Sequence, residues 1–98
     1  MSQLTVVAKI TAKPGKEDAT KEALLALIPT TLAEEGCLNY DMHVSCDEPG
    51  TFLFYENWAS RETWEAHINN DHLQAFIASA EELLAKDVEI STWLMHKA

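Results

Sequence analysis

The sequence predicts an α+β fold in which one antiparallel β-sheet carries its helices on one face. Four segments alternate apolar and polar residues with the period of two that marks a strand. The segments between them repeat apolar residues every three or four positions, as amphipathic helices do. Along the chain the order is strand, helix, two strands, a helix in two pieces, and strand. This βαββαβ order is the ferredoxin-like arrangement, and 98 residues suit a single domain, 1–98.

The first strand is expected over residues 4–13, where apolar residues alternate with threonine and lysine. The Pro-Gly pair at 14–15 ends this strand, because proline cannot donate to a β-ladder. A helix then begins near Lys16, and its apolar stripe consists of Ala23, Leu24, Leu27 and Ile28. We expect Pro29 to kink this helix or to end its first half. Gly36 is expected to supply a left-handed cap after the helical segment.

Two further strands form a predicted hairpin. Residues 37–46 (CLNYDMHVSC) alternate between an apolar and a polar side, and residues 52–58 (FLFYENW) are rich in aromatic residues. The connecting residues 47–50 (DEPG) have the composition of a turn, so the two strands are expected to pair antiparallel.

The last third of the chain predicts two helical pieces and a strand. Ser60 is expected to cap a short helix that extends to about His67, and the Asn-Asn pair at 69–70 interrupts it. Asp71 can cap a second piece, with Gln74 three residues later. Its apolar stripe consists of Leu73, Phe76, Ile77, Ala80, Leu83 and Leu84. Residues 87–97 alternate again and predict the fourth strand.

Both sides of the first, third and fourth strands carry large apolar residues. The set opposite the expected helix-covered face consists of Val7, Leu53, Tyr55, Trp93 and Met95. Helices on one side cannot cover that second face, so it must be covered by a partner sheet or contribute to a ligand cavity. We therefore expect a homodimer that is joined sheet to sheet.

The net charge of the chain and the composition of its segments exclude several classes of binding partner and cellular location. The formal net charge of −9 disfavours binding to nucleic acid or to anionic membranes, since both are negative themselves. No basic stretch leads into an apolar run at residues 1–10, and no run is long enough to span a bilayer. The expected location is the cytoplasm. Two cysteines, Cys37 and Cys46, are expected to be reduced there, with a bridge between them as the alternative.

The sequence lacks the motifs that are typical of several kinds of chemistry. The chain contains no GxGxxG, no phosphate-binding loop and no GxSxG motif, which argues against nucleotide or Rossmann-type flavin binding. His67 and His72 are five residues apart across a helix break, and so lack the i, i+4 spacing of a helical zinc site. No metal site is expected from these spacings. Cys37 precedes a strand rather than a helix, so it is not interpreted as a nucleophile.

Aromatic and imidazole side chains are concentrated in the second half of the chain. They are Tyr55, Trp58, Trp64, His67, His72, Phe76 and Trp93. Such a set can line an apolar pocket with a few polar groups, and the alternative is ordinary aromatic core packing. Glu56 and Asn57 are the carboxylate and amide expected to orient a bound group, and His43 is a further candidate substrate-binding residue.

Three stretches resemble the antibiotic-biosynthesis monooxygenase domain, and together they cover nearly the whole chain. They are residues 4–15, residues 34–44 (EEGCLNYDMHV) and residues 54–76 (FYENWASRETWEAHINNDHLQAF). The most specific element is the Glu-Asn-Trp run at 56–58 followed by the two histidines. Within this family the chain is similar to small stand-alone proteins of the quinol monooxygenase-like branch.

The resemblance implies a dimeric α+β barrel with a pocket between sheet and helices for a quinol- or anthrone-like aromatic. Such proteins oxidise the substrate with O₂ and without flavin, haem or metal, so no cofactor is expected. It implies His67 or His72 as the base, Asn57 and Trp58 as orienting donors, and cavity walls made by Tyr55, Trp64 and Phe76. Haem degradation is not expected, because Ala8, His67 and Ile77 stand where the haem-degrading branch has Asn, Trp and His.

Two other functions stay open at this point. The same histidines and Glu56 can serve an isomerase or lyase of a small oxygenated metabolite, which needs no O₂. A protein that only binds an aromatic metabolite would present the same pocket. The fold follows from the family more directly than the reaction does.

Overall fold

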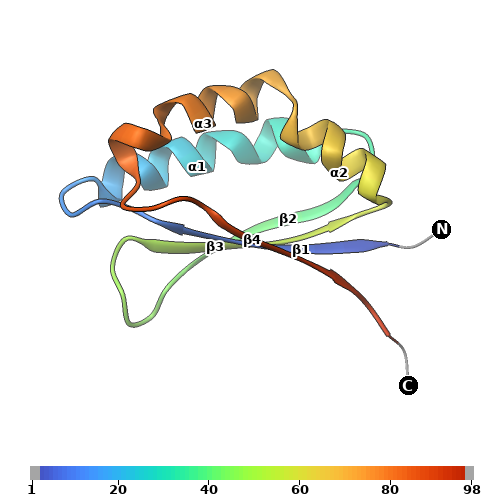
Figure 1. Cartoon of the computed structure of the whole chain (residues 1–98), viewed down its shortest axis with the longest axis horizontal. Coiled ribbons are helices and arrows are strands. Elements are labelled where there is room, and N and C mark those ends of the chain that lie inside the picture. The colour runs from blue at the N-terminus through green and yellow to red at the C-terminus, as the bar shows by residue number, and fades with distance from the viewer. Residues whose placement is uncertain (1–2, 97–98) are drawn as a thin grey trace.

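The computed structural model describes residues 3–96 and has the predicted βαββαβ order, with the second helix in two pieces (Figure 1). The strands are β1 (Leu4–Thr11), β2 (Cys37–Val44), β3 (Thr51–Trp58) and β4 (Glu89–Leu94). The helices are α1 (Glu17–Leu32), α2 (Arg61–Ile68) and α3 (Asp71–Leu83). The ferredoxin-like fold class is thereby confirmed.

The four strands form one antiparallel sheet in the order β2-β3-β1-β4. All three helices lie on the same side of it, and the opposite face is uncovered (Figure 1). The register of the central pair places Val6 opposite Glu56 and Val7 opposite Tyr55. Because side chains alternate along a strand, Val6 and Glu56 face the helices, whereas Val7 and Tyr55 face the open side.

The core lies between the sheet and the helices. The alternation predicted for the first strand is observed, since Leu4, Val6, Ala8 and Ile10 are all buried. Ala8 and Ile10 pack in one cluster with Leu24 and Leu27 of α1, Phe52 and Phe54 of β3, and Leu73 and Phe76 of α3. Leu4 and Val6 form a second cluster with Trp58. Burying each of the larger side chains contributes about 1.5–3 kcal/mol to stability, so this single layer of contacts holds the helices on the sheet.

Some predicted boundaries and caps differ in the structure. The helix α1 continues through Pro29 to Leu32, so the expectation that Pro29 ends its first half is wrong. Pro29 is exposed, and water can therefore satisfy the carbonyl that loses its helical partner. The N-cap of α3 is Asn70 rather than Asp71, because the helix already begins at Asp71. The Gln74 amide donates to the backbone of Ile68 instead of completing a capping box.

The short helix α2 begins where the sequence predicts. The Ser60 side chain accepts a hydrogen bond from the backbone N–H of Thr63, and the Thr63 hydroxyl accepts one from the backbone N–H of Ser60. Gly36 adopts the expected left-handed conformation, with φ of +83°. A Cβ atom at Gly36 would lie within about 2.5 Å of the Thr63 side chain, so glycine lets the end of α1 pack directly against the start of α2.

The uncovered face of the sheet carries the second apolar set. Val7, Leu53, Tyr55 and Trp93 share this face, and the Trp93 side chain is 59% exposed. Every residue of β4 is exposed. This exposed apolar face is the surface that the predicted sheet-to-sheet homodimer requires, and the dimer itself stays a prediction.

Cys37 and Cys46 are both free thiols. Within the described residues, no helix is long and apolar enough to cross a membrane.

Candidate active site

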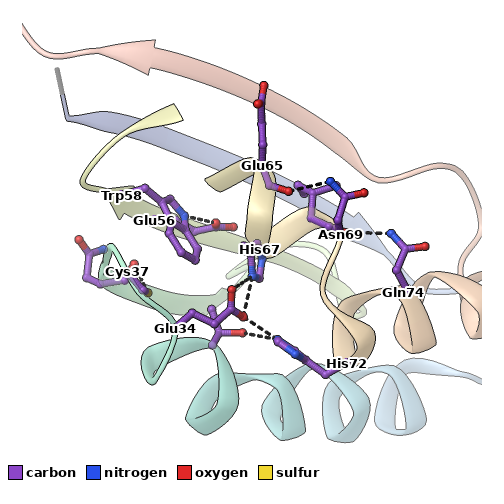
Figure 2. Close-up of polar contacts among 12 residues, drawn as sticks. Glu34, Cys37, Glu56, Trp58, Glu65, His67, Asn69, His72 and Gln74 are labelled. Carbon is purple, nitrogen blue, oxygen red and sulfur yellow. Dashed lines mark hydrogen bonds and ion pairs between the residues drawn. The ribbon is translucent and has the colours of Figure 1, made fainter. Parts of the chain in front are cut away.

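Two imidazoles from different helices converge on one carboxylate, that of Glu34 (Figure 2). Nδ1 of His67, in α2, lies 3.1 Å from Glu34 Oε2 and 3.2 Å from Oε1. Nε2 of His72, in the first turn of α3, lies 2.8 Å from the same Oε2, and Thr31 Oγ1 lies 3.3 Å from this nitrogen. Since a carboxylate only accepts hydrogen bonds, we assign a proton to each of these two ring nitrogens.

The break between α2 and α3 makes this convergence geometrically possible. On one continuous helix, residues 67 and 72 would point to different sides, because five residues make about 1.4 turns of a helix with 3.6 residues per turn. The Asn69-Asn70 pair ends α2 and starts α3, so each histidine reaches Glu34 from its own helix. Glu34 itself follows the end of α1, and the Gly36 turn described above places it beside α2.

His67 has a free acceptor that faces a cavity. Its side chain is 2% exposed and packs against Trp58, with ring centroids 4.7 Å apart, and against the edge of Tyr40. Burial lowers the pKa of His67, and the Glu34 hydrogen bond opposes that change only in part, so the ring is neutral at pH 7. With Nδ1–H donated to Glu34, the lone pair is on Nε2, and no residue among 3–96 donates a hydrogen bond to Nε2.

Glu56 is a buried acid in the same cavity. Its side chain is 4% exposed, and Oε1 accepts a hydrogen bond of 2.9 Å from Trp58 Nε1 (Figure 2). Burial raises the pKa of Glu56 to about 7; the Trp58 hydrogen bond opposes this rise and the negative charge of Glu34 adds to it. At pH 7 the Glu56 carboxyl is therefore about half protonated, and it faces the same apolar space as the neutral imidazole of His67.

The cavity lies between the sheet and the helices and has a volume of about 110 Å³. Its polar lining groups are His67, Glu56 and the Tyr40 phenol. The pKa of Tyr40 is raised, first by burial and then by Glu56, so the phenol stays protonated. The remaining lining is apolar or aromatic and includes Ala8, Phe54, Trp64, Leu73, Phe76 and Ile90. A few polar groups in an apolar space are typical of a small-molecule site.

The structure separates the sequence-predicted site residues into two groups. His67, Glu56, Trp64 and Phe76 line the cavity. Trp58 packs against His67 and donates a hydrogen bond to Glu56, but it does not line the cavity itself. His72 also lies outside the cavity lining and contacts Glu34.

Tyr55, Asn57 and His43 do not join this group. All three project from the open face of the sheet, because they alternate with cavity-facing neighbours along β2 and β3. Asn57 Oδ1 accepts hydrogen bonds from the Gln3 and Thr5 side chains, and its Nδ2 donates to Asn39. Tyr55 is therefore not a cavity wall within one chain, and Asn57 is not a donor to the cavity.

Sequence reasoning missed two residues of the site. Glu34 was quoted only as part of a motif, although a carboxylate two residues before a predicted left-handed glycine is well placed to fold back onto a neighbouring helix. Tyr40 was recognised only as the apolar side of a strand. Its alternation with the polar residues Asn39 and Asp41 is the signal in the sequence that it faces the helices.

Glu34, His67 and His72 also form a set of potential metal ligands. One donor atom from each lies within 4.8 Å of the others. The i, i+4 spacing of a helical zinc site applies to two histidines on one helix, and so it does not cover a third ligand from the turn after α1.

The chain is similar in fold and in sequence to several known proteins. The fold matches the crystal structure of PA3566 from Pseudomonas aeruginosa with a TM-score of 0.93 and 34% sequence identity, covering 99% of this chain and 97% of that one. The "Probable quinol monooxygenase YgiN" of Escherichia coli K12 is 32% identical, over 74% of this chain and 80% of that protein. A protein of Synechocystis, sll1783, is 28% identical over 92% of this chain, which spans 61% of that longer protein. Residues 3–79 match the family model described as antibiotic biosynthesis monooxygenase.

Proposed function

We propose that this chain, which belongs to the antibiotic biosynthesis monooxygenase family, oxidises a small quinol- or anthrone-like aromatic with O₂ and without an organic cofactor. The family and its named relatives support a monooxygenase-like function of the oxidoreductase kind. The substrate class and the use of O₂ are the parts that we propose.

The observation that carries the proposal is the orientation of His67. Its Nδ1–H is held by Glu34, and its Nε2 lone pair faces an apolar cavity that an aromatic ring can enter. A neutral imidazole fixed in one tautomer is a suitable general base for a phenolic or enolic proton. Trp64 and Phe76 supply flat apolar walls for the ring.

The proposed reaction uses the electron-rich substrate as its own reductant. His67 takes a proton from a substrate hydroxyl, and the resulting anion donates an electron to O₂. In the net conversion, the substrate gains one oxygen atom and loses two hydrogen atoms, and the second oxygen atom leaves as water. A dry cavity favours this course because it excludes competing proton donors around the reactive anion.

Glu56 is proposed as the acid of the site. Below its pKa of about 7 it is a neutral carboxyl group beside the cavity, with one oxygen already engaged by Trp58. Its proton can stabilise the negative charge that develops on a substrate oxygen. The protonated Tyr40 phenol is a second donor on the same side of the sheet.

We also propose a homodimer that forms through the uncovered face of the sheet, and a cytoplasmic location. The apolar side chains of Val7, Leu53, Tyr55 and Trp93 on that face support the dimer, since a monomer would leave them in water. The acidic charge supports the absence of nucleic-acid and membrane partners.

The test is O₂ uptake by metal-free protein with a panel of hydroquinones and anthrones. We expect uptake above the autoxidation rate, and a loss of about 10²-fold or more in the His67→Gln variant, because general-base catalysis typically contributes that much. The matched control is His96→Ala, which removes an exposed histidine that does not line the cavity. Uptake at the autoxidation rate for every substrate would refute the proposal.

A non-redox isomerase or lyase is the second candidate. The pairing of a base, His67, with an acid, Glu56, in one cavity favours it, because proton transfer between two carbon or oxygen atoms needs both and no O₂. Turnover under strict anaerobiosis distinguishes the two functions.

A further inference from the structure

We propose that Glu34, His67 and His72 form a binding site for a divalent transition-metal ion such as Zn²⁺. The site lies on the side of His67 that faces away from the cavity. It shares Glu34 and His67 with the proposed active site, but the ion itself takes no part in the proposed reaction.

The positions of the donor atoms already approach those of a metal centre. Glu34 Oε2 lies 2.8 Å from His72 Nε2 and 3.1 Å from His67 Nδ1, and all three donors lie within 4.8 Å of one another. Ligands held at about 2.0–2.1 Å from a tetrahedral zinc ion lie roughly 3.3–3.4 Å apart. Small side-chain rotations would therefore open enough space for an ion.

The chemistry of the donors selects the class of ion. Two imidazoles and one carboxylate suit Zn²⁺, Co²⁺ or Ni²⁺, whereas Mg²⁺ and Ca²⁺ prefer sites made of oxygen atoms. The ion would take the place of the two N–H groups that now bridge the imidazoles to Glu34, and each neutral ring would keep its one proton on the other nitrogen. Because a protonated imidazole cannot bind a metal ion, binding would weaken as the pH falls.

An acidic depression at the surface gives a cation access to this site. It is lined by Glu34, Glu35 and Glu62 together with Thr63, Ala66 and Asn70. Glu35 and Glu62 are exposed, and Glu34 itself lines the depression. The His72 side chain is 21% exposed, whereas His67 is buried, so Glu34 and His72 are the ligands that a cation meets first. Three carboxylates around one depression, on a chain of net charge −9, attract cations to it.

Occupancy would change what His67 offers to the cavity. A metal ion on Nδ1 leaves the ring proton on Nε2, so His67 would present a hydrogen-bond donor where the metal-free protein presents an acceptor. The proposed ion therefore competes with the base rather than assisting it.

The experiment is a titration of metal-free, untagged protein with Co²⁺, followed by displacement with Zn²⁺. We expect one equivalent of Co²⁺ per chain, with visible absorption bands of a four- or five-coordinate ion. His72→Ala and Glu34→Gln should each weaken binding by more than about 10-fold, while His96→Ala should leave it unchanged. Circular dichroism checks that each variant is folded. His67 is left intact because it belongs to the core.

Three results would overturn the proposal. They are no saturable Co²⁺ binding, unchanged binding in His72→Ala, or strong near-ultraviolet charge-transfer bands that indicate ligation by Cys37 or Cys46. Because the titration contains no organic substrate, its outcome is independent of whether the protein consumes O₂.

Discussion

The Glu34 carboxylate lies 3.1–3.2 Å from His67 Nδ1 and thereby determines which nitrogen of that ring faces the cavity. A carboxylate behind an imidazole is a recurrent way to fix a histidine base, because the held Nδ1–H leaves the lone pair on Nε2. Here the two residues are 33 positions apart in the sequence and meet because the turn after α1 packs against α2.

This relationship predicts the tautomer of His67 in solution. Nitrogen-15 NMR of the imidazole at pH 7 should show a protonated Nδ1 and an unprotonated Nε2. In Glu34→Ala, the ring loses its acceptor and should shift toward the Nε2–H form. Glu34→Gln should keep more of the Nδ1–H form, since the amide oxygen still accepts. An Nε2–H ring in the metal-free wild type would contradict the assigned geometry.

Glu56 predicts an unusual dependence of stability on pH. Its folded pKa, about 7, lies above the ordinary value of 4.5, so the folded state binds more protons than the unfolded state between these values. The contribution of Glu56 to stability is therefore fully present below pH 4.5 and is lost as the pH rises through 7. Relative to wild type, Glu56→Gln should gain roughly 2–3 kcal/mol in unfolding free energy between pH 4.5 and pH 8.

Urea denaturation of both proteins at several pH values measures this difference. His67 also titrates in this range, with the opposite sign because its pKa is lowered. The comparison removes that contribution, since both proteins retain His67. A constant difference between the two proteins across the range would show that Glu56 is ionised normally in the fold.

Trp58 should be the tryptophan whose replacement costs the most stability. It is fully buried, stacks on His67 and donates to Glu56. Trp58→Phe removes volume from the core and leaves the Glu56 oxygen without its donor, so we expect a loss of about 2–4 kcal/mol. Trp93→Phe, on the face that the proposed dimer covers, should cost less than Trp58→Phe in the same denaturant titration, because it removes no hydrogen bond to a buried carboxyl group. Equal losses would mean that the packing around Trp58 is not special.

Two glycines with almost the same backbone angle provide a matched test of the α1–β2 turn. Gly36 and Gly15 have φ of +83° and +88°, but only Gly36 would place a Cβ against another side chain, that of Thr63. Gly15→Ala should lose about 1 kcal/mol through backbone strain alone. Gly36→Ala should lose at least about 1–2 kcal/mol more. Thermal unfolding measures both, and equal losses would argue against close packing of the turn on α2.

The proposed dimer can be tested by sedimentation equilibrium at micromolar concentration. We expect twice the chain mass of 11.0 kDa, because an apolar sheet face of this kind is stable in water only when covered. Tyr55→Glu places a charge in the middle of that face and should yield monomers, whereas Leu25→Glu, on the exposed side of α1, should remain dimeric. A wild type of single-chain mass would refute the dimer.

The fold was predictable because its elements carry strong local patterns. The alternation of Leu4, Val6, Ala8 and Ile10 specified which side of β1 is buried, and the Ser60 cap located the start of α2. Boundaries were less predictable. Pro29 is tolerated inside α1 because its side of the helix faces water. The sequence pattern around residue 29 does not predict that this side is exposed.

The site was predictable only in part, because it depends on contacts between distant segments. His67, Glu56 and Trp64 are recognisable by residue type, but the carboxylate that orients His67 comes from the turn after α1, 33 positions away in the sequence. The family resemblance implies Tyr55 as a cavity wall and Asn57 as an orienting donor. The two-residue period, by which Tyr55 shares the face opposite the helices, places both on the open face instead.

The three-residue cluster also joins the two βαβ halves of the domain. Glu34 follows the helix of the first half, and both histidines belong to the helices of the second, so these contacts exist only when the halves are docked. Any molecule that binds the docked arrangement, and not the unfolded chain, must stabilise the entire domain by RT ln(1 + [L]/Kd). A ligand bound to this cluster therefore stabilises the whole domain against unfolding, and not only one local loop.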